Sequence, residues 1–188
     1  MRKVLLLTFT LVCLLFTQGQ SQANDVKTVK AAIVKHALEL GVDPALALSI
    51  ARMESGFRYD AKSSHGAVGV FQLMPSTAKV MGLNPYYLND NIKGGLMYYQ
   101  KLYKMFGSME LALAAYNAGP TYVQKYKAVP PCSKTFVSRI IADYNNLKKN
   151  PDPAILDARK HSKAPAKPQV TEVKIDEIIP MAEPTETI

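Results

Sequence analysis

The sequence predicts an all-α domain with little or no sheet, and three features of residues 24–150 lead to that prediction. Apolar residues recur at spacings of three and four along most of this range, which is the period of an amphipathic helix. Capping residues and helix breakers separate these periodic segments. No convincing run of alternating apolar and polar residues appears among them, so no strand is expected.

The N-terminal stretch, residues 1–23, is expected to be a secretory signal peptide and not part of the fold. Arg2 and Lys3 give it a positive start, residues 4–16 are apolar, and residues 21–23 (Ser-Gln-Ala) match a small-x-small cleavage site. The apolar run is shorter than the roughly 20 residues that span a bilayer, which argues against a membrane anchor. The sequence therefore predicts an exported protein.

Two helices are expected first in the body. Residues 25–40 carry an amphipathic pattern that Gly41 is placed to end. Residues 43–44 (Asp-Pro) form a helix start, with Asp as the N-cap and Pro in the first position. The run 45–53 is apolar on nearly all sides and belongs in the core, and Glu54 stands at its end.

The rest of the body is expected to consist of shorter helices after a loop at residues 59–69, which is rich in Ser and Gly. Pro75 is expected to break or kink the first of these helices. The expected helices span residues 70–80, 92–106, 109–118, 121–126 and 134–147.

The charge distribution separates the body from the C-terminal segment. The chain has a formal net charge of +8, and residues 24–150 carry 16 Lys or Arg against 8 Asp or Glu, which is also +8. In an exported protein this favours an anionic polymer such as a cell wall as partner over nucleic acid. Residues 151–188 contain six prolines, with a basic first half and an acidic second half. A flexible tail is expected there.

Glu54 is the candidate for chemistry that the residues themselves suggest. A carboxyl group at the end of an apolar helix is partly desolvated, which disfavours its charged form and raises its pKa. Asp60 and Asp90 lie in loop or cap contexts, so no second acid has a comparable setting. Cys132 has no intrachain partner once the leader is removed, and without a base nearby we expect it to be a small buried residue.

Three motifs follow one another through the body. They are Glu54-Ser55-Gly56-Phe57 with Ser63, Gly66-Ala67-x-Gly69 and Gln72-Leu73-Met74-Pro75-x-Thr77-Ala78; Asn91-Ile92 with Gly95 and Tyr98-Tyr99; and Ala112-Leu113-Ala114-Ala115-Tyr116-Asn117-Ala118-Gly119-Pro120. Over residues 26–145 the chain resembles the catalytic domain of soluble lytic transglycosylases, whose fold is shared with goose-type lysozyme. The resemblance implies a lysozyme-like fold for residues 24–150.

The resemblance also implies an activity and its residues. Such enzymes cleave the β-1,4 bond between N-acetylmuramic acid (MurNAc) and N-acetylglucosamine (GlcNAc) in peptidoglycan without water, and leave 1,6-anhydro ends. Glu54 then matches the catalytic acid, and Ser63, Gln72 and Tyr116 match residues that line the substrate cleft, with Asn117 beside them. For Ser63, Gln72 and Asn117 a purely structural role is the alternative, and for Ser55 a structural role is the one expected. No metal or cofactor is implied.

The expected partners follow from the same resemblance. They are peptidoglycan glycan strands in the periplasm and, through residues 151–188, a secretion, conjugation or pilus assembly that needs a local opening in the wall. Residues 132–137 (Cys-Ser-Lys-Thr-Phe-Val) depart from a common family pattern, Glu-Thr-Arg-x-Tyr-Val. We therefore expect this chain to lack any sugar or peptide contact made by that glutamate and that tyrosine hydroxyl.

Other functions stay open. A hydrolytic muramidase of the same fold would need a positioned water and usually an added acid. A non-catalytic peptidoglycan-binding protein would have no need of an acid like Glu54. A nucleic-acid-binding protein is disfavoured by the leader and by the lack of a basic recognition helix.

Overall fold

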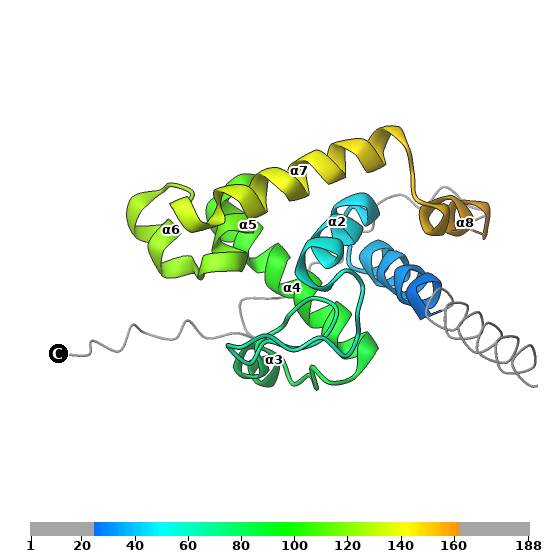
Figure 1. Ribbon diagram of the computed structural model, residues 1–188, viewed down its shortest axis with the longest axis horizontal. Coiled ribbons are helices and arrows are strands. Elements are labelled where there is room, and N and C mark those ends of the chain that lie inside the picture. The colour runs from blue at the N-terminus through cyan, green and yellow to red at the C-terminus, as the bar shows by residue number, and fades with distance from the viewer. Residues whose placement is uncertain (1–24, 162–188) are drawn as a thin grey trace, which may run out of the picture.

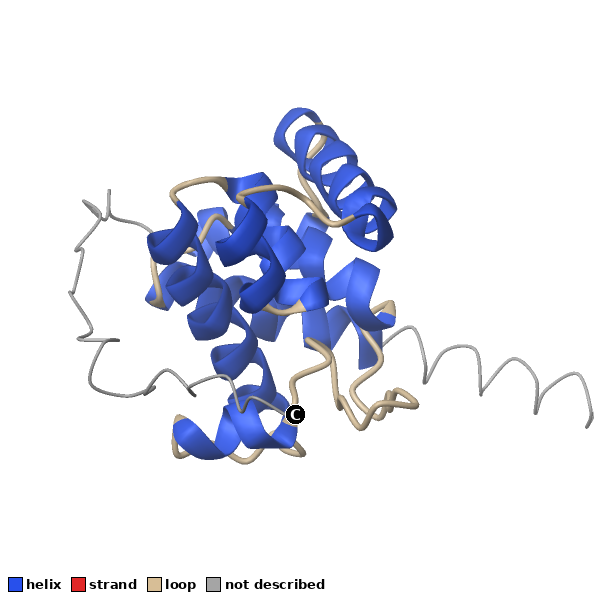
Figure 2. Cartoon of the chain, turned by 90° about the vertical axis from the view of Figure 1, so that its left-hand side faces the viewer, coloured by secondary structure: helices blue, strands red, loops and turns tan. Residues whose placement is uncertain are grey.

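The computed structural model describes residues 25–161, and this part of the chain consists of helices and loops (Figures 1 and 2). Residues 25–39 are helical and form the N-terminal helix. It is followed by α2 (Pro44–Ser55), α3 (Pro75–Val80), α4 (Leu88–Phe106), α5 (Met109–Ala118), α6 (Pro120–Tyr126), the short 3-10 helix η1 (Pro131–Ser133), α7 (Lys134–Lys149) and α8 (Pro153–His161). Within residues 25–161 pairing of strands is limited to isolated bridges, so the all-α prediction is confirmed.

Helix α2 is the core helix that the sequence predicts. The Asp43 carboxylate accepts a hydrogen bond from the Ala45 amide at 2.9 Å, and Pro44 occupies the first turn. Most of its side chains are buried, and α7 packs along it (Figure 1). The helix ends at Gly56, which has a φ of 62° that favours glycine. These local signals place Glu54 in the last turn.

Helix α3 is shorter than expected, because residues 70–74 form part of a loop. The helix begins at Pro75, whose missing amide costs nothing in a first turn. Before it, Val68 and Leu73 exchange backbone hydrogen bonds of 3.1 and 2.9 Å, and Gln72 has a φ of 46°. Most of the apolar residues of this stretch are therefore buried, but they lie in a loop and not in a helix.

Helix α4 begins at Leu88, before the expected start at residue 92. Asn91 lies inside the first turns and is only 1% exposed. Its side chain is used to hold the loop before α3, as described below. Further along, α4 packs against α5, as Figure 1 shows.

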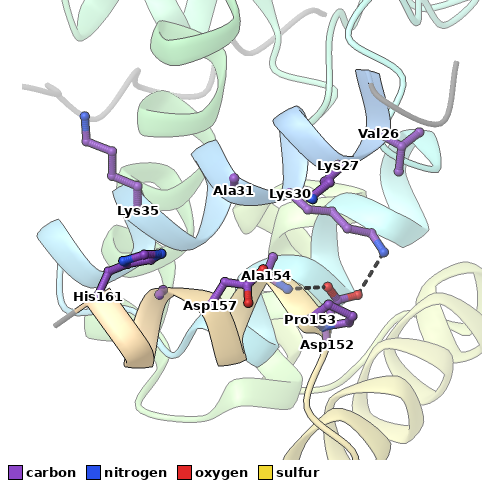
Figure 3. Close-up of a pocket in the computed structure, with 11 residues that line it drawn as sticks. Val26, Lys27, Lys30, Ala31, Lys35, Asp152, Pro153, Ala154, Asp157 and His161 are labelled. Atoms are coloured by element: carbon purple, nitrogen blue, oxygen red, sulfur yellow. Dashed lines mark hydrogen bonds and ion pairs between the residues drawn. The ribbon is translucent and has the colours of Figure 1, made fainter. Parts of the chain in front are cut away.

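The expectation of a flexible tail from residue 151 onward is wrong for its first part, because residues 153–161 form helix α8. Asp152 accepts a hydrogen bond from the Ala154 amide at 3.0 Å and an ion pair from Lys30 at 2.8 Å. Ile155 is buried in the main core. Figure 3 shows α8 lying along the N-terminal helix, with the contact between Lys30 and Asp152 joining the two.

The ends of the chain lie outside the described residues. The signal peptide expected at residues 1–23 and the remainder of the expected tail, 162–188, therefore stay predictions. No helix within residues 25–161 is long and apolar enough to cross a membrane.

Candidate active site

Glu54 lies in the last turn of α2, with its side chain largely enclosed by the protein. Burial raises the pKa of its carboxyl group to about 8, well above the ordinary value of 4.5. Desolvation alone causes this shift, since neither a cation nor a hydrogen-bond donor from residues 25–161 contacts the carboxyl group. Glu54 is therefore protonated at neutral pH, as a general acid must be.

Tyr116, on α5, is the predicted site residue that lies near Glu54. Desolvation raises its pKa well above 10, and Glu54 and Tyr98, once ionised, raise it further. Its hydroxyl donates a hydrogen bond of 2.8 Å to the carbonyl oxygen of Phe71. The Tyr116 side chain is therefore uncharged and lies beside Glu54, and its hydroxyl points to the loop that contains Phe71.

Tyr98 packs against Tyr116, a contact that was not expected from the sequence. The rings of Tyr98 and Tyr116 have centroids 5.3 Å apart and are tilted by 53°. Burial also raises the pKa of Tyr98. Its membership in the second motif was the signal that could have marked it.

The loop ahead of α3 is fastened to three helices through its backbone. The Ser55 hydroxyl, on α2, donates to the Val70 carbonyl at 2.8 Å. The Asn91 side chain, on α4, accepts from the Phe71 amide at 2.9 Å, while Tyr116, on α5, binds the Phe71 carbonyl. The backbone N–H and C=O of the buried residue Phe71 are thus both satisfied by side chains, as buried backbone requires. The structural role expected for Ser55 is confirmed.

Asn91 makes two more hydrogen bonds that fix the same loop. Its amide nitrogen donates to the Val68 and Pro85 carbonyls at 2.8 and 2.9 Å. Gly69 approaches so closely that a Cβ there would lie 2.3 Å from this nitrogen, and its φ of 75° also favours glycine. Glycine is therefore needed at this position.

Ser63 and Gln72 lie in this loop, and both stabilise it. The Ser63 hydroxyl accepts from the Ala67 amide at 3.0 Å. The Gln72 side-chain nitrogen donates to the carbonyls of Gly69 and Ala61 at 2.9 and 3.3 Å. Within residues 25–161 the Ser63 O–H and the Gln72 side-chain oxygen have no hydrogen-bond partner, so both could bind a ligand.

Asn117 is held in a different place, at the exposed end of α5. Its side-chain oxygen accepts a hydrogen bond of 2.8 Å from Ser133, which is fully buried in η1. The expectation of a buried Cys132 is wrong, since Ser133 takes the inward position and Cys132 is exposed. The structure thus brings Ser63, Gln72 and Tyr116 together through one loop, whereas Asn117 belongs to the η1 connection.

The cavity in Figure 3 lies between the N-terminal helix and α8, and its lining includes no predicted site residue. Within residues 25–161, no group of three or more His, Cys, Asp or Glu side chains is arranged to hold a metal ion.

These features define an all-α, lysozyme-like domain whose core helix α2 carries in its last turn a largely enclosed carboxyl group with a raised pKa. The family model described as the transglycosylase SLT domain matches residues 31–135. The chain therefore belongs to the transglycosylase SLT domain family.

Individual relatives agree with this family. The chain is 29% identical over 152 residues to the transglycosylase of Enterobacteria phage PRD1, covering 80% of this chain and 54% of the phage protein. It is 36% identical over 97 residues to the soluble lytic murein transglycosylase of Salmonella typhimurium, covering 45% of this chain and 15% of that protein. The chain thus spans about half of the first relative and a small part of the second.

Solved structures resemble the fold as well. The lytic transglycosylase Slt of Pseudomonas aeruginosa, solved as an inactive mutant, superposes with a TM-score of 0.57 at 28% identity, over 66% of this chain and 25% of that one. The 70 kDa soluble lytic transglycosylase of Escherichia coli gives a TM-score of 0.56 at 25% identity, with the same coverage.

Proposed function

We propose that this protein is a peptidoglycan lytic transglycosylase that cleaves the MurNAc–GlcNAc β-1,4 bond and leaves 1,6-anhydro-MurNAc ends. The observation that carries the proposal is Glu54, a carboxyl group with a pKa of about 8 and no charged partner among residues 25–161. The names of the relatives and the family support it.

The proposed reaction uses Glu54 twice. Protonated Glu54 donates its proton to the glycosidic oxygen, and the bond to C1 of MurNAc breaks. The resulting carboxylate then accepts the proton of the C6 hydroxyl of the same MurNAc as this oxygen bonds to C1. The ring closes, Glu54 regains its proton, and no water is consumed. A buried carboxylate is a strong base once ionised, so the same burial favours both steps.

The described carboxylates support a mechanism with one acid. Glycosidases that use two acids hold the second within about 5–10 Å of the first. Here three of the other acids form ion pairs instead, since Asp43 pairs with Lys148, Asp143 with Arg52 and Asp152 with Lys30. None of them affects the pKa of Glu54.

The test is product analysis on purified peptidoglycan. Residues 24–188 and a Glu54→Gln variant are incubated with the polymer, and the released muropeptides are identified by mass spectrometry. Anhydro products from the unaltered protein alone are expected. Reducing-end products would instead assign a hydrolytic muramidase, and no release from either protein would favour a binding protein.

We also propose export to the periplasm and a local wall-opening role for a secretion, conjugation or pilus assembly, with the tail as tether. Because α8 is part of the folded body, the informative truncation removes residues 162–188 and keeps residues 153–161. The tether proposal expects retained activity and lost localisation to the assembly site. Unchanged localisation after this truncation would end it.

A further inference from the structure

Helix α6 carries two large aromatic side chains on its surface. Of its residues only Val123 is buried. Tyr122 and Tyr126 lie one turn apart and are 39% and 55% exposed. Their ring centroids are 4.6 Å apart with a tilt of 45°, so the two rings form one continuous apolar surface. Tyrosine is enriched where one face binds a partner and the hydroxyl stays in water.

The surroundings of this pair are positively charged. The Lys125 ammonium lies 5.1 Å from the centre of the Tyr126 ring, and Lys127 follows as an exposed residue in the left-handed region. Residues 111–142 contain no Asp or Glu, but they include four Lys or Arg. The tyrosine pair is therefore placed in a basic segment that suits an anionic ligand.

Along the chain, the tyrosine pair comes shortly after the candidate site. Tyr116 lies beside Glu54 near the end of α5. Gly119, the N-cap of α6, follows the last residue of α5. Helix α6 packs on α5, at the end of the molecule away from α8 (Figure 1). A polymer bound at Glu54 and running past the end of α5 would meet α6 next.

We propose that Tyr122 and Tyr126 form a platform for a sugar ring of the glycan strand, outside the bond that Glu54 cleaves. The apolar face of an N-acetylhexosamine stacks on the rings, and Lys125 and Lys127 bind carboxylates of the stem peptide. This subsite rests on the proposed function for its ligand. It adds binding energy for long strands and takes no part in the chemical step.

The binding experiment uses the Glu54→Gln background so that the strands stay intact. A Tyr122→Ala, Tyr126→Ala double variant is compared with Tyr122→Phe, Tyr126→Phe, which keeps the rings, by sedimentation with purified peptidoglycan. The alanine pair is expected to weaken binding roughly tenfold, because it removes both rings on which the sugar stacks. The phenylalanine pair is expected to bind within about twofold.

Tyr103→Ala is the matched control, because Tyr103 is also exposed and stacks on another tyrosine, Tyr99, of the same helix. It is expected to leave binding unchanged. Circular dichroism melting confirms that each variant is folded. If the alanine pair lowers the melting temperature, binding is measured instead with the two single alanine variants and with Lys125→Glu. Each of these is expected to weaken binding.

The kinetic experiment separates this inference from the proposed function. With Glu54 intact, the alanine pair is expected to raise KM on long glycan strands and to leave kcat unchanged. Normal binding and normal KM in the alanine pair would overturn the subsite, even if anhydro products are released. Conversely, weakened binding by the alanine pair would support the subsite even if the unaltered protein released no anhydro product.

Discussion

At the scale of single residues, Glu54 determines how the protein responds to pH. Its pKa of about 8 means that the acid form dominates at neutral pH and is lost as the pH rises through 8. Cleavage is therefore expected to fall about tenfold per pH unit above 8, because the first step needs the proton. The kcat measured from pH 5 to pH 10 on purified peptidoglycan checks this. A rate that keeps rising up to pH 10 would contradict a protonated Glu54.

The same pKa affects stability, with a sign that follows from proton linkage. The folded state binds the Glu54 proton more tightly than the unfolded state. With respect to Glu54 alone, the stability of the fold is therefore highest below pH 4.5, where Glu54 is protonated in both states, and it falls as the pH rises towards 8. Glu54→Gln keeps a neutral group, and we expect it to raise the free energy of unfolding by up to about 4 kcal/mol at pH 8 and by about 1 kcal/mol at pH 5, since one pKa unit corresponds to about 1.4 kcal/mol. Urea denaturation at the two pH values measures this, and equal effects at both would refute it.

Tyr116 offers a second prediction at this scale. Tyr116→Phe removes the donor to the Phe71 carbonyl, which then lacks its side-chain partner in a buried place. The expected loss of stability is about 1–3 kcal/mol. The kcat is expected to fall as well, because the loop beside Glu54 loses one of its attachments. Tyr103→Phe, on an exposed ring, is the control for the loss of a hydroxyl, and both variants are compared by thermal melting and kcat.

At the scale of elements, the loop ahead of α3 depends on Asn91. Asn91→Ala removes its hydrogen bonds to the Phe71 amide and to two carbonyls, and all of these groups are buried. We expect a loss of roughly 3 kcal/mol and a large fall in kcat. Asn145→Ala, on the exposed face of α7, is expected to change both by little. Urea denaturation and product release provide the two measurements.

Helix α8 gives a prediction about truncation. A chain ending at residue 150 loses Ile155 from the core and the ion pair between Asp152 and Lys30. We expect it to be less stable than a chain ending at residue 161 by about 2 kcal/mol, most of it from the lost apolar burial. Thermal melting of the two chains tests this. Equal melting temperatures would show that α8 does not stabilise the body.

The elements that the sequence predicts are those whose signals are local. Gly41, the Asp43–Pro44 start and Gly56 define the first two helices through residues that are neighbours in the chain. The role of Asn91 is invisible at that level, because its partner Phe71 lies 20 residues away. Likewise, Asp152 and Pro153 form a helix start like the one before α2, but Lys30, which holds them, is 122 residues distant.

The candidate site divides in the same way. Glu54 could be placed at the end of a buried helix from periodicity alone, and the structure agrees about its burial. Tyr116 points to a backbone carbonyl, and Gln72 and Ser63 stabilise their own loop. These arrangements depend on positive φ angles in the loop, which cannot be predicted from the spacing of apolar residues. The roles of Ser63, Gln72 and Asn117 in substrate binding stay predictions.

At the scale of the whole molecule, the excess of positive charge gives a prediction about salt. Residues 24–150 carry a net +8, and a peptidoglycan strand has carboxylates on its stem peptides. Binding of the Glu54→Gln variant is expected to weaken severalfold between about 0.05 and 0.5 M NaCl, because exposed charges are screened over shorter distances. Sedimentation at several salt concentrations measures it. Salt-independent binding would mean that stacking and hydrogen bonds dominate.

The ion pair between Lys30 and Asp152 has a consequence for how the molecule could be mounted. It joins the first and last described helices, so residues 26 and 161 line the same cavity. Helices α5 and α6 lie at the opposite end of the body (Figure 1). A partner attached at either end of residues 25–161 would therefore approach the body from the side of this cavity, and α5 and α6 would stay uncovered.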